Sequence, residues 1–371
     1  MYSNNETLRT KVEGRFYFLE GLRGICAQMV FLAHFNMVFG NQYPVEQLWS
    51  LEMVFNGHNA VSIFFILSGL VLSVSMFSRG SEFIPYVFRR IFRLYPAFIL
   101  CLWVLFLVEK GDMHSYFREA VMLIPVQGNR HLLPGWTLPV ELTMSLLVPF
   151  MVIIARKSAW LLLGFGIVLV FIFHVDAFLF HFIAGILLAR VLIDRGLDFL
   201  KVFKRNTSMG KSVGPVVISG NRKWRWPFTG LIVLVFLASW TFEYLPILWR
   251  SSPVFIDSYT KHLLVFSING ISGIIVLAFI LNNGLLRSYM GKSVPLFLGK
   301  ISYSFYLIHY PCILLINGKI LDKYSSYWQI DYMLKFILAW FFSILAACFI
   351  HIFWETPMIK AGTWLSRKFR L

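Results

Sequence analysis

Long apolar runs alternate with shorter polar segments along almost the whole chain. A helix that crosses about 30 Å of hydrocarbon needs about 20 mostly apolar residues. The pattern therefore predicts an all-α fold, a polytopic integral membrane bundle of about ten transmembrane helices. The predicted spans are 16–39, 54–77, 91–108, 138–155, 159–174, 176–193, 227–247, 261–283, 294–317 and 331–353.

The composition supports this class and excludes others. Of 371 residues, 58% are hydrophobic and 18% aromatic, and the mean hydropathy is +0.70, so an ordinary soluble globule is excluded. The net charge of +16 would suit nucleic acid, but the basic residues are sorted by loop, so we expect no nucleic-acid partner. The four cysteines have neither disulfide nor metal-ligand spacing, so we expect no metal.

Lys and Arg are concentrated in alternate loops, which fixes the expected orientation. By the positive-inside rule both termini are cytoplasmic, and an even number of spans agrees. A basic stretch at 194–226 is expected to be a flexible cytoplasmic loop that faces anionic lipid or an anionic ligand, and lipid is the favoured alternative. We predict one transmembrane domain over 1–371, without an appended soluble domain.

Arg23 and His34 are the most informative pair. Eleven helical positions come to about three turns, so both side chains share one helix face, about 16 Å apart along the axis. Ionisable groups inside a membrane mark functional sites by default. The competing explanation is an Arg that reaches the headgroups and a His bonded to a neighbouring carbonyl.

Other polar residues are expected at two depths. Glu141, His309, Asn56, His58 and Asn59 are predicted toward the outer side, near His34, and Arg89, Arg90 and Arg93 toward the inner surface. Such an arrangement suits proton transfer above an anion-binding vestibule. The Arg cluster is explained equally well if it only fixes the membrane orientation by the positive-inside rule. His309 is explained equally well as a structural histidine that is buried and hydrogen-bonded to a neighbour. Ser68-Gly69 would permit close helix approach.

Five stretches in order resemble the membrane-bound acyltransferase-3 family. They are Leu19-Glu20-Gly21-Leu22-Arg23-Gly24 running to His34, Gly57 to Gly69 with Ser62-Ile63-Phe64-Phe65-Ile66-Leu67-Ser68-Gly69, Arg90-x-x-Arg93 with Leu94-Tyr95-Pro96, Trp136-Thr137-Leu138-Pro139-Val140-Glu141, and Ser302 to His309. The resemblance implies ten core helices, acyl-CoA that enters from the cytosol, and roles for Arg23, His34, Arg90, Arg93 and Glu141. It also implies a multi-pass protein of a bacterial inner (plasma) membrane.

We therefore expect an acyl-CoA-dependent O-acetyltransferase. Acetyl-CoA would be the donor, and the acceptor would be a sugar hydroxyl of a lipid-linked or cell-surface polysaccharide such as an O-antigen, on the outer side. A hydroxyl needs a base, for which neutral His is suited. The predicted roles are catalysis for His34, Glu141 and Arg23, donor binding for Arg89, Arg90, Arg93 and Ser68, and acceptor binding for His309, His58, Asn59 and Trp136.

Within this hypothesis Glu141, if it contacts His34, would fix the tautomer of that ring. Two alternatives stay open. The first is a proton-coupled secondary transporter, which needs only the buried acid and imidazole. The second is an acyltransferase that acts on a small molecule or a lipid.

Overall fold

The structure is a computed structural model, and it describes residues 17–42, 57–79, 83–121, 131–173, 175–194, 258–317 and 327–368. Within these ranges every regular element is a helix, which confirms the all-α fold. The helices are α2 (Tyr17–Phe39), η1 (Gly40–Gln42), α4 (Gly57–Arg79), α5 (Phe83–Glu109), α6 (Met113–Ala120), η3 (Leu133–Trp136), α7 (Thr137–Lys157), α8 (Ala159–Phe171), α9 (Leu179–Asp194), α13 (Ser258–Asn282), α14 (Gly284–Met290), α15 (Ser293–Lys300), α16 (Ser302–Leu315), α17 (Trp328–Ile350), η6 (His351–Glu355) and α18 (Thr356–Lys368).

Five helical segments of the described residues are long and apolar enough to cross a membrane, or six if the bent pair α13 and α14 counts as one span. They are Tyr17–Phe39, Gly57–Phe77, Phe83–Glu109, Leu133–Lys157 and Trp328–Lys368. The apolar helix α8 is shorter, and the predicted span 227–247 lies outside the described residues. The total of ten spans stays a prediction. The expected span 294–317 is divided at Ile301 into α15 and α16.

The chain forms two compact units whose segments alternate along the sequence. The first unit contains Met1–Cys26, His58–Ser78 and Phe150–Lys300, and the second contains Ala27–Gly57, Arg79–Pro149 and Ile301–Leu371. Neither unit is a continuous stretch of chain. No single point in the sequence separates the two units. That 1–371 is one domain stays a prediction.

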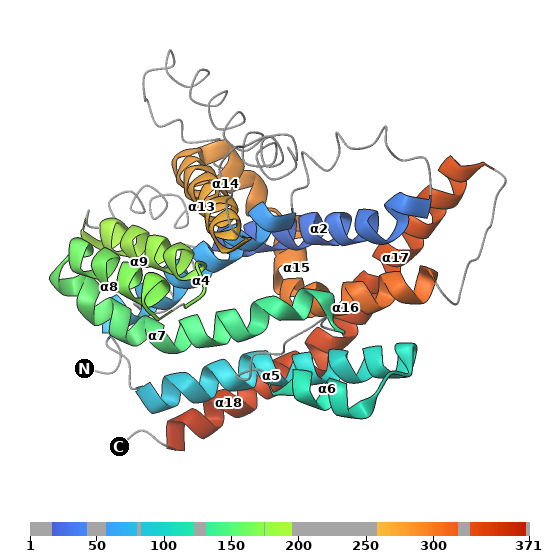
Figure 1. Ribbon diagram of the computed structural model, residues 1–371, viewed down its shortest axis with the longest axis horizontal. Helices are drawn as coiled ribbons and strands as arrows, with labels where there is room; N and C mark the ends of the chain where they lie inside the picture. The colour runs from blue at the N-terminus through green and yellow to red at the C-terminus, as the bar shows by residue number, and fades with distance from the viewer. Residues whose placement is uncertain are drawn as a thin grey trace, which may run out of the picture. The chain divides into compact units, whose positions relative to one another are not determined.

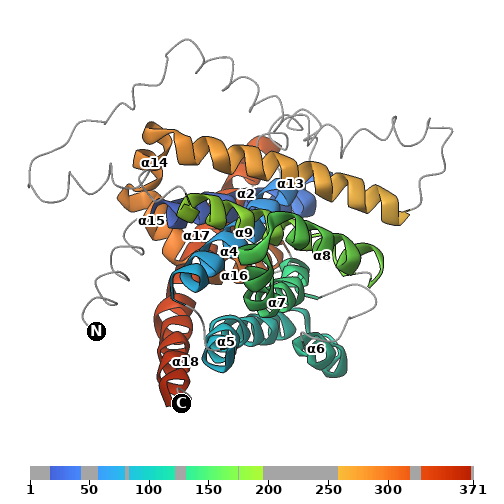
Figure 2. The same ribbon diagram turned by 90° about the vertical axis from the view of Figure 1, so that its left-hand side faces the viewer.

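In the first unit, α4 and α9 approach closely at small residues. A Cβ placed on Gly185 of α9 would overlap the carbonyl oxygen of Ile66, and one on Gly69 of α4 would overlap the carbonyl of Phe182. The expectation that Ser68-Gly69 permits close helix approach is thus confirmed for Gly69. Asn283 separates α13 from α14 and caps the start of α14, because its side chain accepts hydrogen bonds from two backbone amides of that helix. The two helices meet at 94°, and Figure 2 shows the sharp bend between them.

In the second unit, α5 is the helix against which several others pack. The amphipathic helix α18 packs against α5, and Figures 1 and 2 both draw the two helices next to each other. Gly362 of α18 lies against the Phe92 ring. On another side, α16 packs against both α5 and α17. The second unit thus places α5, α16 and α17 around the polar residues described below.

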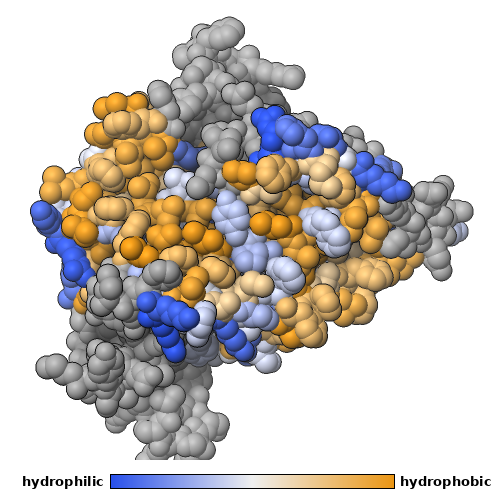
Figure 3. Space-filling model, turned by 90° about the horizontal axis from the view of Figure 1, so that it is seen from below, coloured by the Kyte–Doolittle hydropathy of each residue, from blue (hydrophilic) through white to orange (hydrophobic). Residues whose placement is uncertain are grey.

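The surface is apolar in the manner of a protein that lies in lipid. On the face drawn in Figure 3, hydrophobic side chains cover most of the described surface, and the hydrophilic ones form separate patches. Large side chains such as Trp160 and Phe349 are 82% and 63% exposed. Soluble proteins seldom expose apolar surface on this scale. With the apolar spans, this makes the chain a multi-pass membrane protein.

Candidate active site

His34 of α2 lies directly beside His309 of α16. His34 Nδ1 and His309 Nε2 are 2.7 Å apart, and the two ring planes differ by only 9° with their centroids 5.1 Å apart. Nearly coplanar rings let an N–H of one point at the in-plane lone pair of the other. The contact is therefore a well-aligned hydrogen bond between two imidazoles. It joins residues 275 positions apart in the chain.

The second nitrogen of His309 decides which atom carries the proton. His309 Nδ1 is 3.0 Å from the carbonyl oxygen of Phe305, one turn earlier on α16. A carbonyl oxygen only accepts, so Nδ1 of His309 must donate, and Nε2 of the neutral ring is an acceptor. His34 Nδ1 must then be the donor in the His34–His309 bond. In the neutral ring of His34, Nε2 is then the nitrogen without a proton, as a base requires.

Aromatic rings surround the imidazole pair. His309 is fully buried, and the rings of Phe31, Phe305 and Tyr306 have their centroids within 6.2 Å of its own. Rings this close restrict rotation of the imidazole and exclude water from it. The packing therefore holds the two histidines in one arrangement.

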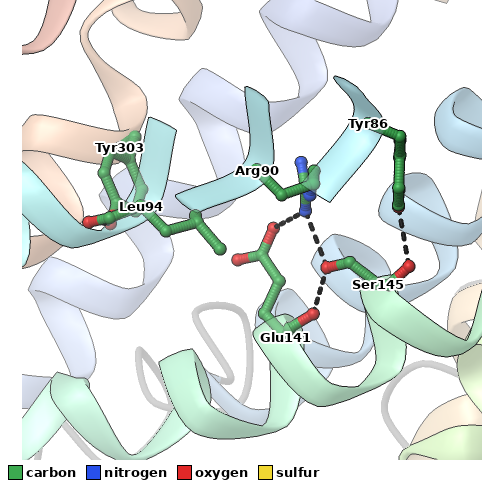
Figure 4. Close-up of polar contacts among 6 residues, drawn as sticks. All are labelled: Tyr86, Arg90, Leu94, Glu141, Ser145 and Tyr303. Atoms are coloured by element: carbon green, nitrogen blue, oxygen red, sulfur yellow. Dashed lines mark hydrogen bonds and ion pairs between the residues drawn. The ribbon is translucent and has the colours of Figure 1, made fainter. Parts of the chain in front are cut away.

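A second polar group joins α5 to α7 (Figure 4). Arg90 Nη2 donates to Glu141 Oε1 and to Ser145 Oγ, each at 3.0 Å. Tyr86, one turn before Arg90, donates to the carbonyl oxygen of Ser145 at 2.7 Å. The Arg90 side chain is only 8% exposed. Arg90 and Glu141 thus form a partly buried ion pair inside the unit, 51 residues apart in sequence.

The Arg90–Glu141 pair changes the expected depth of Glu141 in the bundle. Tyr303 of α16 donates to the carbonyl of Leu94 at 2.6 Å, and Arg90 lies one turn before Leu94 on α5. Tyr303 is six residues before His309, about 9 Å along the helix. Glu141 therefore lies at the level of Arg90, on the Tyr303 side of His309. The prediction that Glu141 shares the level of the histidines is wrong.

The reason is the path of the segment before α7. Tyr306 OH donates to the carbonyl of Pro134 at 3.2 Å and is 3.0 Å from Thr137 Oγ1. Gly135 is buried beside the ring of Phe98, in the middle of α5. The turn η3 is therefore buried inside the second unit, so α7 starts there and Glu141 falls one turn deeper. The apolar pattern could not reveal this, because it assumes that a span begins at the surface.

The other two arginines of the cluster differ from Arg90. Arg89 Nη1 donates to Ser366 Oγ of α18 at 3.4 Å, a long contact. Arg93 is half-buried and its charge acts on Tyr303. Arg89 and Arg93 remain partly exposed, so they are better placed than Arg90 to receive a phosphate.

The remaining predicted residues are distributed between the units. Arg23 is half-exposed on α2, and the continuous helix Tyr17–Phe39 confirms that it shares a helix with His34. Arg23 and three residues of α4 belong to the first unit: His58 is exposed, and Asn59 and Ser68 are buried. Trp136 is half-buried in η3 of the second unit. The structure brings together His34 with His309 and Arg90 with Glu141.

Sequence reasoning missed two groups in the second unit. Tyr306 and Thr137 lie within stretches that resemble the family, but nothing indicated that they meet. Glu355 accepts hydrogen bonds from Ser304 and His351 just beyond the last predicted span. The signal available in the sequence was an acidic residue directly after an apolar run, which is a functional-site hypothesis by default.

The fold and the site define an integral membrane protein with a pair of hydrogen-bonded imidazoles inside an apolar bundle. The acyltransferase-3 family model, described as an acyltransferase domain, matches residues 16–353. The chain therefore belongs to the acyltransferase-3 family and is a membrane acyltransferase. No curated protein and no solved structure gives a significant match.

Proposed function

We propose that this protein is an O-acetyltransferase that moves an acetyl group from acetyl-CoA to a sugar hydroxyl of a lipid-linked or surface polysaccharide. The observation that carries the proposal is the hydrogen-bonded series from the Phe305 carbonyl through His309 to His34. It leaves His34 Nε2 as a neutral base. An alcohol is a poor nucleophile until a base removes its proton.

The reaction proceeds at this base. His34 Nε2 takes the proton of the hydroxyl as the oxygen forms a bond to the thioester carbonyl carbon. The C–S bond then breaks, and the imidazolium returns the proton to the sulfur, so ester and free CoA leave. His309 stabilises the imidazolium by accepting from its Nδ1–H, the role that a carboxylate has in hydrolase triads.

The donor would be held by cations at one end of α5. Arg89 and Arg93 would pair with the phosphates of CoA, because a guanidinium binds phosphate oxygens strongly. Arg90 is already bonded to Glu141, so it would hold α5 and α7 in place. Arg23 would act on the thioester, as the family resemblance implies, and Ser68, His58, Asn59 and Trp136 keep their predicted binding roles.

We further propose a location in a bacterial inner membrane with both termini in the cytoplasm. Acetyl-CoA would then reach the site from the cytosolic side, and the acceptor hydroxyl from the outer side. The excess of Lys and Arg in the segments assigned to the cytosol supports this orientation.

The test uses sealed inverted vesicles that contain the protein, with glycan acceptor trapped inside and labelled acetyl-CoA outside. The acceptor should gain the mass of one acetyl group while CoA appears outside. His34→Ala should abolish transfer at equal protein level, and His114→Ala, which changes an exposed histidine of α6, should retain it. Transfer that survives His34→Ala would remove this residue from the reaction. CoA that accumulates inside would exclude the proposed sidedness.

A further inference from the structure

The carboxylate of Glu355 is buried near the histidine pair, because its partner Ser304 lies on α16, the helix that carries His309. Glu355 is 4% exposed and ends η6, a π-helical turn between α17 and α18. Ser304 Oγ donates to Glu355 Oε2 at 2.7 Å, and His351 Nδ1 is 3.0 Å from the same oxygen. Single π-helical turns inside helices are frequent at functional sites. An acid within an apolar bundle is likewise a functional-site hypothesis by default.

The two carboxylate oxygens of Glu355 differ in their contacts. Both Ser304 and His351 bond to Oε2, and across the described ranges Oε1 accepts no hydrogen bond. A carboxylate has several lone-pair positions and gains most from charge-assisted bonds with N–H donors. The structure thus keeps one strong acceptor atom available beside a buried hydroxyl.

Ser304 and Glu355 lie a short distance along α16 from the histidine pair. Ser304 precedes His309 by five residues, about 7.5 Å along the helix. Its neighbour Tyr303 donates to Leu94 of α5 (Figure 4), and the charges of Arg93 and Glu355 both act on Tyr303. Ser304 and Glu355 therefore lie between the arginine end of α5 and the histidine pair. A donor that extends from Arg93 to His34 would cross the level of Ser304 and Glu355 along α16.

We propose that Glu355, supported by Ser304 and His351, binds the amide of the acyl donor that is nearest to the thioester. In an acyl-pantetheine arm, four bonds separate the reacting carbonyl carbon from this amide nitrogen, about 5 Å when extended. A hydrogen bond adds about 3 Å, which matches the axial step from His309 to Ser304. The amide N–H donates to Glu355 Oε1. The inference rests on the proposed thioester-dependent acyl transfer and adds a donor subsite to it.

The experiment compares two small thioester donors with the protein in proteoliposomes. S-acetyl-N-acetylcysteamine carries the amide, and S-butyl thioacetate has a hydrocarbon chain of similar length in its place. The wild-type protein should use the amide donor more efficiently in kcat/KM, by about tenfold or more, as expected for one hydrogen bond to a charged group. Glu355→Met should bring this ratio close to one, and Glu355→Gln, which retains an acceptor oxygen, should preserve part of it.

The outcomes separate a binding role from a merely structural one. If Glu355→Met lowers the activity with both donors in equal proportion, the residue serves only packing and the proposal is wrong. If Glu355→Met does not accumulate, the wild-type ratio and Glu355→Gln still decide, because a wild-type protein indifferent to the amide overturns the proposal. Wild-type transfer from acetyl-CoA without donor discrimination would leave the proposed function standing and remove only the subsite.

Discussion

Arg90 and Glu141 face each other across α5 and α7 as an ion pair 3.0 Å long, with side chains only 8% and 22% exposed. In the sequence, Arg90 belongs to a basic run that resembles a phosphate site. In the structure its guanidinium is bonded to a carboxylate and to Ser145. The arginine cluster is therefore divided between Arg90, which joins two helices, and Arg89 and Arg93, which are partly exposed.

Breaking this pair on one side should destabilise the protein more than replacing both partners. Arg90→Met or Glu141→Leu alone leaves one partly buried charge, at a cost of about 3 kcal/mol, while the double replacement removes both charges. Thermal unfolding in detergent should show a lower Tm for each single variant and recovery in the double variant. A double variant with the summed loss of the two singles would show that the ion pair is not coupled.

Arg93 should act on the donor instead of on stability. Arg93→Ala is expected to raise the Kd of CoA about tenfold, as the loss of one charge-assisted contact implies. The Tm should hardly change. Isothermal titration with CoA measures this, and Arg118→Ala on the exposed side of α6 is the matched loss of one arginine. Equal CoA affinity in the wild type, Arg93→Ala and Arg118→Ala would mean that Arg93 serves only to orient the protein in the membrane.

His309 should be replaceable only by a side chain that accepts a hydrogen bond from His34. His309→Leu removes the acceptor and should lower kcat by about 100-fold or more, on the scale of general-base effects. His309→Gln offers an amide oxygen to His34 Nδ1–H and should retain more activity. The pH profile of kcat should shift in both variants, because in the proposed mechanism His309 stabilises the imidazolium of His34. Equal activity of the Leu and Gln variants, with an unshifted profile, would contradict the tautomer argument.

Tyr306 should hold the turn η3 inside the second unit. Tyr306→Phe keeps the ring and removes the hydroxyl that contacts the Pro134 carbonyl and Thr137, at a cost of about 1 kcal/mol per hydrogen bond. Hydrogen exchange of residues 131–137 should become faster. Tyr289→Phe removes an exposed hydroxyl of α14 and is the control. Unchanged exchange in Tyr306→Phe would mean that the hydroxyl does not anchor η3.

Gly185 and Gly164 give a matched test of close helix packing in the first unit. A methyl group on Gly185 would overlap the Ile66 carbonyl, and one on Gly164 would meet no heavy atom within 4 Å. Gly185→Ala should cost about 1–3 kcal/mol through overpacking. Gly164→Ala should be neutral or gain up to about 1 kcal/mol from helix propensity. Thermal unfolding of the two variants measures the difference, and equal Tm values would disprove the close contact of α4 with α9.

The sequence alone determined the class of the protein and the positions of most described helices. Apolar runs of span length predict helices because each residue contributes locally to the cost of placing backbone and side chains in lipid. The same local periodicity correctly placed Arg23 and His34 on one helix. Five ordered motifs indicated the family, which the match over 16–353 confirms.

The tertiary structure decided which polar groups meet. His34 and His309 are 275 residues apart, and Arg90 and Glu141 are 51 apart, and hydropathy carries no information on which helices become neighbours. The structure also decided depth, because the buried turn η3 moves Glu141 by a helical turn, and it revealed Glu355 between Ser304 and His351. Hydrogen bonds depend on distances of about 3 Å and on direction, and only the packing of helices from distant parts of the chain fixes these quantities.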